Sequence, residues 1–212
     1  MKKLFFITSF LLFFACQNTT KKFNLQTDIN PFFQEWNTPY GVPPFAFIKD
    51  EHYMPAFEKG MKDNLKEIDI IVENPEAPTF ANTIEALERS GKLLSKVQRT
   101  FFNLVGSNTN PQLQELQRAL SPILSAHYDK IGLNKELFSR IEQLWKEREK
   151  LKLTNEQYKL LEDTRKTFVR SGSLLNETEK EKITAINAKI SSLTTTFGQN
   201  LLAETNNFEL IL

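Results

Sequence analysis

The fold class of this chain is decided by the stretch Pro78-Thr79-Phe80-Ala81-Asn82-Thr83-Ile84-Glu85-Ala86-Leu87-Glu88-Arg89-Ser90-Gly91, which runs on to Leu104. Its apolar residues recur at steps of three and four: Ile84, Leu87, Leu94, Val97, Phe101, Leu104 and Val105. That spacing is typical of one face of a helix. Pro78 cannot continue a preceding helix, and Thr79 or Asn82 is able to cap the new one. The stretch by itself predicts an ordinary amphipathic helix that packs into a core and carries no catalytic group.

The same periodicity on both sides of this stretch predicts an all-α fold, an antiparallel assembly of about six helices joined by short turns. The expected helices cover residues 50–72, 78–105, 111–131, 135–151, 154–170 and 176–205. Asp50 is expected to cap the first helix, and Pro122 is expected to kink the third. The third helix is expected to turn inward Leu113, Leu116, Leu120, Ile123, Leu124 and Ile131.

The last two helices open with the spacing of a capping box, in which each partner bonds the backbone N–H of the other. Thr154 is followed three residues later by Gln157, and Asn176 by Glu179. The final helix places apolar residues on one side in alternating three- and four-residue steps, as in a coiled coil. These residues are Ile183, Ile186, Ile190, Leu193, Phe197 and Leu201.

Residues 1–16 have the pattern of an export signal. Lys2 and Lys3 form a basic start, and an almost unbroken apolar run follows from residue 4 to residue 14. The run is shorter than the roughly 20 residues of a permanent membrane helix. Ala15 directly before Cys16 resembles a bacterial lipobox, in which that cysteine is lipidated, although Phe14 leaves plain secretion open. We therefore expect an exported bacterial protein that is periplasmic or anchored to the membrane through Cys16.

Two segments flank the helices. Residues 17–30 are polar and predict a flexible tether, and Pro31 opens an irregular but packed arm of prolines and aromatic residues. After the last helix, Asn206-Asn207 predicts a turn, and residues 207–212 predict the start of a next element. Because an apolar run that stops exposed is unusual, this segment favours a truncated chain over an edge strand at a partner surface.

Composition excludes several classes of function. The 212-residue chain has a net charge of +1 with its basic residues spread along helices, so nucleic-acid binding is not indicated. Its single cysteine allows no intrachain disulfide. Neither a Gly-x-Ser-x-Gly elbow nor a Walker phosphate loop occurs. Paired carboxylates such as Glu85 and Glu88 are typical of solvated helix faces.

The two histidines decide the question of a metal site. A zinc peptidase helix needs His-Glu-x-x-His, so that two imidazoles lie one turn apart. His52 is followed by Tyr53 and, four residues on, by Ala56; His127 is followed by Tyr128 and, four residues on, by Ile131. Isolated histidines more often cap a helix or bond a carbonyl group. No catalytic, cofactor-binding or metal-ligating residue is therefore assigned in this chain.

Several segments, in order, resemble the N-terminal region of the M3 family of zinc metallopeptidases, the group of thimet oligopeptidase, oligopeptidase A and peptidyl-dipeptidase Dcp. They are Asn30-Pro31-Phe32 with Trp36, Gly41-Val42-Pro43-Pro44-Phe45, His52-Tyr53-Met54-Pro55-Ala56-Phe57, Pro78-Thr79-Phe80-Ala81-Asn82-Thr83-Ile84 with Leu87, Ser90 and Gly91, Leu137-Phe138-Ser139-Arg140-Ile141, Phe168-Val169-Arg170-Ser171-Gly172 and Phe197-Gly198-Gln199-Asn200-Leu201-Leu202. Each segment alone is weak evidence for the resemblance, but the order and spacing of the segments from Asn30 to Leu202 are specific. The export signal and these segments favour the Dcp branch.

The resemblance implies a mostly helical, two-lobed enzyme with a deep channel that admits short, unfolded peptides. In such enzymes two histidines and a glutamate hold zinc, and another glutamate activates the metal-bound water. Those ligands lie in the C-terminal half of the family and have no counterpart here. The chain is thus expected to form part of one lobe of a peptidase that releases C-terminal dipeptides, to need a missing C-terminal catalytic portion, and to be inactive by itself.

A second interpretation remains open. The chain could be a self-contained helical lipoprotein that acts as a binding or scaffold module. A degraded peptidase copy that binds peptides without cutting them lies between the two. A monomeric chain that melts cooperatively and exposes no apolar patch would favour the module.

Overall fold

The computed structural model describes residues 29–209. The expected export signal with Cys16, most of the expected tether, and residues 210–212 lie outside the described residues. Every regular element within the described part is helical, which confirms the all-α prediction. The α-helices are α1 (Tyr53–Val72), α2 (Ala86–Arg89), α3 (Lys92–Ser107), α4 (Pro111–Gly132), α5 (Lys135–Glu147), α6 (Asn155–Ser171) and α7 (Glu177–Asn207). Five short turns are 3₁₀ or π in type: η1 (Pro31–Phe33), η2 (Pro39–Gly41), η3 (Asp50–His52), η4 (Phe80–Glu85) and η5 (Arg148–Lys150).

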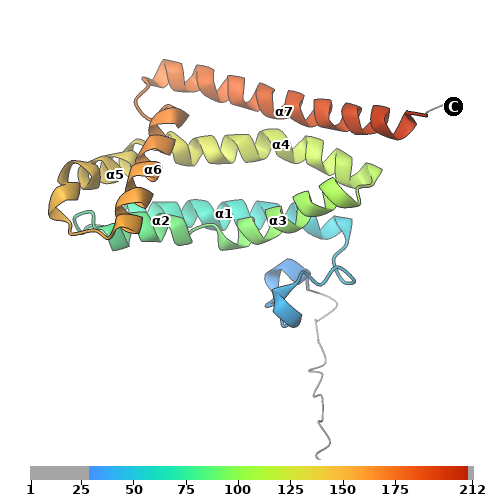
Figure 1. The fold of residues 1–212 in the computed structure, drawn as a ribbon, viewed down its shortest axis with the longest axis horizontal. Helices are drawn as coiled ribbons and strands as arrows, with labels where there is room; N and C mark the ends of the chain where they lie inside the picture. Colours follow the sequence, from blue (N-terminus) through green and yellow to red (C-terminus); the bar gives the residue numbers. More distant parts are fainter. Residues whose placement is uncertain (1–28, 210–212) are drawn as a thin grey trace, which may run out of the picture.

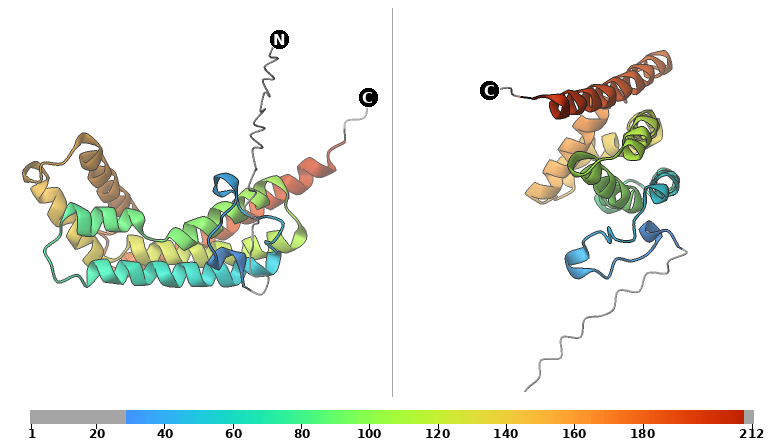
Figure 2. Two further views of the ribbon diagram at one scale, coloured as in Figure 1. Left: turned by 90° about the horizontal axis from the view of Figure 1, so that it is seen from below. Right: turned by 90° about the vertical axis from the view of Figure 1, so that its right-hand side faces the viewer.

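Helices α1, α4 and α7 run roughly along the long axis of the molecule and are stacked in layers (Figure 1). Helix α7 lies on α4, α4 lies on α1 and α3, and the arm of residues 31–47 lies beyond α1 and α3 on the side away from α7 (Figure 2). Helices α5 and α6 pack together at one end, where α6 leads the chain up to α7. No helix within residues 29–209 has the length and apolarity needed to cross a membrane.

Two apolar clusters form the core. The first joins the arm to α1, α3 and α4 and buries Phe32, Tyr53, Ala56, Phe57, Leu94, Val97, Phe101, Leu113, Leu120 and Leu124. The second joins the other end of α1 to η4, α5 and α6 and buries Ile68, Ile71, Ile84, Leu137, Phe138, Ile141, Leu144, Leu161 and Phe168. Burial of these side chains is the main source of stability for a fold built from amphipathic helices.

The stretch that decides the fold class is helical, but the prediction of one continuous helix from residue 78 to residue 105 is wrong. Of the two predicted cap residues, Thr79 caps the helix: its Oγ1 accepts from the Asn82 amide, and Asn82 Oδ1 accepts from the Thr79 amide. The helix then ends at Arg89, because Ser90 is extended and Gly91 adopts a left-handed conformation at a φ of 68°. The Gly91 amide donates to Glu67 Oε2 at 2.6 Å, so α1 accepts the amide freed by the break. The break lets α3 take its own direction along α1.

Two predictions at the start of the fold are also corrected. Asn30 is an anchor rather than the end of a tether, since its side chain caps η1 and donates to the His52 carbonyl at 2.8 Å. Asp50 does not cap α1, because the η3 turn precedes that helix and Asp50 instead accepts from Asn110 at 3.0 Å. The cap at this turn is His52, whose Nδ1 accepts from the Lys49 amide at 3.0 Å.

The later helices agree with the sequence predictions, with two exceptions. The capping boxes that open α6 and α7 form as predicted, and α4 continues past Pro122. Ile123, expected inward, is 44% exposed. Three residues advance a helix by about 300°, so Ile123 falls at the edge of the face that Leu120 buries. Asn206 and Asn207 form the last turn of α7 instead of a separate turn, because the α-helical backbone continues through them.

Candidate functional site

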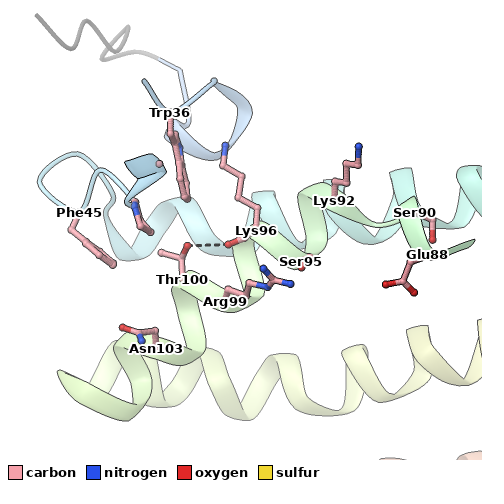
Figure 3. Close-up of a pocket in the computed structure, with 12 residues that line it drawn as sticks. Trp36, Phe45, Glu88, Ser90, Lys92, Ser95, Lys96, Arg99, Thr100 and Asn103 are labelled. Carbon is pink, nitrogen blue, oxygen red and sulfur yellow. Dashed lines mark hydrogen bonds between the residues drawn. The ribbon is translucent and has the colours of Figure 1, made fainter. Parts of the chain in front are cut away.

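A groove between the arm and α3 has a volume of about 790 Å³. The arm contributes Trp36, Gly41, Pro43 and Phe45, and the other wall consists of Glu88, Ser90, Lys92, Ser95, Lys96, Arg99, Thr100 and Asn103. Figure 3 shows the aromatic side chains of the arm on one side of this hollow and the polar side chains of α3 on the other. The groove combines three cationic groups with one carboxylate and two aromatic rings, which suits a ligand with a carboxylate and an apolar part.

Lys96 holds the arm against α3. Its ammonium group donates to the carbonyl groups of Gln34 at 2.8 Å and Phe32 at 3.2 Å and lies 4.0 Å from the centre of the Trp36 ring. Burial lowers the pKa of this ammonium, and Glu35 partly opposes that shift. Lys96 is thus occupied in building the groove, whereas Lys92 and Arg99 are exposed in its wall.

Replacing Lys96 with Met is expected to loosen the arm without unfolding the helices. The substitution keeps the apolar stem and removes two charge-assisted hydrogen bonds, so local opening should become easier by about 2 kcal/mol. Limited proteolysis should then cut within residues 31–47 roughly 30-fold faster. Lys92→Met, an exposed change one turn earlier on α3, is the matched control. Equal cleavage rates in the two variants would refute this role for Lys96.

The two histidines are not arranged to bind a metal ion. His52 caps the η3 turn, and the Nε2 of His127 lies 2.9 Å from Asn64 Oδ1, so each histidine makes a hydrogen bond within the fold. Among the described residues, no three Cys, His, Asp or Glu side chains are grouped so that they could hold a metal ion. Cys16, the predicted lipidation site, lies outside the described residues.

His127 belongs to a buried polar chain that joins three helices. The Asn64 amide donates to Ser90 Oγ at 3.2 Å, and Ser90 Oγ donates to the Leu87 carbonyl at 2.7 Å. The Nδ1 of His127 is buried without a partner among the described residues. Burial lowers the pKa of His127, and the nearby Lys130 lowers it further. These shifts favour the neutral form of the histidine, in which an Nε2–H can donate to Asn64 Oδ1.

Acidification is expected to destabilise the fold through His127. The pKa of this histidine is lower in the folded state than its ordinary value of 6.5. Below that pH the unfolded chain therefore binds a proton that the folded chain does not, and stability falls as the pH falls. Urea denaturation of the wild type and of His127→Gln at about pH 7.5 and about pH 5.5 tests this, because glutamine keeps a donor for Asn64 and does not titrate. An identical loss of stability in both proteins would contradict the assignment.

Helix α7 turns its polar side inward and its apolar side outward. It is attached to α4 by small and polar groups: Ser121 Oγ and Thr195 Oγ1 lie 2.6 Å apart, and Ser191 donates to the Ser121 carbonyl at 2.8 Å. Asn187 donates to Asp129 at 2.8 Å, closer to the start of the helix. The α7 stripe, as we call the outward apolar residues, consists of Ile186, Ile190, Leu193, Phe197 and Leu201. These residues are 55–69% exposed, although their spacing is that of a core face.

Sequence reasoning missed the groove and the outward direction of the α7 stripe. Lys92, Lys96 and Arg99 do share one face of α3, at steps of four and three residues, and that spacing was the available signal. The arm residues that complete the groove are some 60 residues away in the chain, so only the folded structure brings them to α3.

Comparison with known proteins finds related peptidases. The chain is 39% identical to the dipeptidyl carboxypeptidase of Escherichia coli (strain K12) over 186 residues, which cover 88% of the chain and 27% of that protein. It is 40% identical to the dipeptidyl carboxypeptidase of Salmonella typhimurium over 174 residues, and 28% identical to the oligopeptidase A of Haemophilus influenzae over 172 residues. The chain spans about a quarter of the length of these relatives. No family model matches the chain.

Proposed function

Because this chain belongs to the M3 family of peptidases, we propose that it forms part of the helical lobe that borders the substrate channel of an enzyme that hydrolyses short peptides. The identity to dipeptidyl carboxypeptidases over most of the chain carries this proposal. The helical fold supports it, since the described part contains layered helices of the kind expected for one lobe. The complete enzyme is proposed to use zinc and to remove dipeptides from the free C-terminus of its substrates.

The preference for C-terminal dipeptides rests on two observations. The chain is closer in sequence to the two dipeptidyl carboxypeptidases than to the oligopeptidase A. The groove beside the arm presents Lys92 and Arg99, which suit a peptide carboxylate. An endopeptidase needs no such recognition, because its substrates continue on both sides of the bond that is cut.

The residues of this chain do not fit a catalytic zinc ion. His127 Nε2 is already bonded to Asn64, and His52 accepts a backbone hydrogen bond at a turn. Neither histidine has a second histidine four residues on. Zinc would polarise the peptide carbonyl and activate water, but its ligands would have to come from polypeptide other than these 212 residues.

Export and lipidation of Cys16 belong to this proposal as well. Their support is the basic start, the apolar run and the Ala15-Cys16 pair in the sequence. Mass spectrometry of the mature N-terminus tests them: a lipidated Cys16 as the first residue is expected. An N-terminus that begins at Met1 would overturn both.

A chimera tests the proposed function. The chain, without residues 1–16, would replace the matching quarter of the Escherichia coli dipeptidyl carboxypeptidase. The chimera is expected to release dipeptides from an N-blocked peptide with a free C-terminus, to spare the same peptide with an amidated C-terminus, and to lose activity to a chelator. The unmodified Escherichia coli enzyme is the control. A soluble, folded chimera that cuts nothing would overturn the proposal.

A self-contained binding or scaffold module is the second candidate. Both core clusters close within the described residues, which favours a unit able to fold alone. The exposed α7 stripe argues against a free module, because such a module is not expected to present so long an apolar face to water. Binding of an apolar dye by the monomeric chain would support the lobe over the module.

A further inference from the structure

The inner face of α7 packs on α4, and its outer face is exposed and can contact a second partner. Polar contacts to α4 occur along most of the helix, at Asn187, Ser191, Thr195 and Gln199. These residues recur every four positions and define one side of the helix. The α7 stripe lies on the other side and extends over more than four turns. Figure 1 shows that α7 is an outermost layer, with α4 beneath it.

The α7 stripe has the composition of a buried surface. Ile186, Ile190 and Leu193 are 55%, 56% and 59% exposed, and Phe197 is 69% exposed. Exposed apolar residues are common when they stand singly, but a contiguous row marks an interaction surface. No other α-helix among residues 29–209 exposes such a row.

The spacing of the α7 stripe fits a helix as its partner. From Ile183 the apolar residues follow at steps of three, four, three and four up to Phe197, which is the repeat that packs knobs into holes. Lys182 and Lys189 lie exposed beside this seam, seven residues apart and on the same edge. A complementary helix would therefore carry an apolar seam flanked by acidic residues.

We propose that the α7 stripe seats a helix from the remainder of the peptidase, with an apolar seam and an acidic edge facing Lys182 and Lys189. This inference rests on the proposed function. Its occupant follows from length: the relatives are nearly four times longer than the part that this chain matches, so most of their mass lies elsewhere. An outermost helix with an exposed apolar row is a surface to which that mass can join.

Thiol labelling in the chimera tests this contact. Ile190→Cys is made in a Cys16→Ser background of the 212-residue chain and in the chimera, which does not contain Cys16. Its labelling rate is read by mass spectrometry of the peptide that contains it. In the separate chain the thiol should react rapidly. In the chimera it should react at least about 100-fold more slowly, because it becomes accessible only when the helices open. Ile70→Cys on α1, at a single isoleucine that is 70% exposed, is the control and should react rapidly in both.

Each outcome separates this contact from the proposed function. An active chimera with a rapidly labelled Cys at position 190 overturns the contact and leaves the function standing. An inactive chimera with a protected position 190 overturns the function but retains the docking of a helix. If the thiol is already protected in the separate chain, and protection rises with chain concentration, then a second copy occupies the α7 stripe and the proposal fails.

Discussion

The isolated 212-residue chain is expected to hydrolyse peptides no faster than buffer, at least about 10⁶-fold more slowly than a complete peptidase. Both histidines are bonded within the fold, and the described residues offer no group of side chains that could hold a metal ion. Without a metal or another activated nucleophile, water attacks a peptide bond at its uncatalysed rate. The measurement is the release of dipeptides from a chromogenic peptide, with and without added zinc.

The decisive control for this expectation is a chelator. Trace activity from a contaminating enzyme would vary between preparations and would not follow the main peak on a sizing column. Hydrolysis that co-elutes with the pure chain, disappears with the chelator and returns with zinc would show that this chain holds its own catalytic metal. That result would also require a different account of His52 and His127.

Replacing Phe101 with Ala is expected to cost about 3–5 kcal/mol of the free energy of unfolding. Phe101 is fully buried at the centre of the first core cluster. Its ring lies 5.1 Å from the ring of Tyr53 and 5.4 Å from that of Phe57, both in edge-to-face geometry. Truncation leaves a cavity between α1 and α3, and the close-packed neighbours can relax into it only in part. Urea denaturation of the chain measures the loss.

Phe102→Ala is the matched control, because the same ring is removed from the neighbouring residue of the same helix. Phe102 is 40% exposed, so its loss should cost about 1 kcal/mol or less. A similar cost for both variants would mean that the first cluster is not the centre of stability. It would also favour a chain whose core is completed by other polypeptide.

Local chemistry in the sequence was enough to predict much of the helical fold. The pairs Thr154 with Gln157 and Asn176 with Glu179 place two helix starts, because a capping box needs only residues three apart. The break at Gly91 was missed, although glycine is the residue expected at a left-handed position. Because the apolar repeat continues across the break, periodicity alone does not reveal it.

Tertiary contacts decided the features that bear on function. Lys96 bonds arm residues that lie more than 60 positions away in the sequence, and His127 and Asn64 are separated by a similar distance along the chain. No local sequence pattern therefore predicts either contact. The clearest case is α7. Its sequence determined an apolar side and a polar side, because periodicity fixes which residues share a face. Only the folded structure decided that the polar side meets α4 and the apolar side meets solvent, since the direction of a face depends on which neighbour offers complementary contacts.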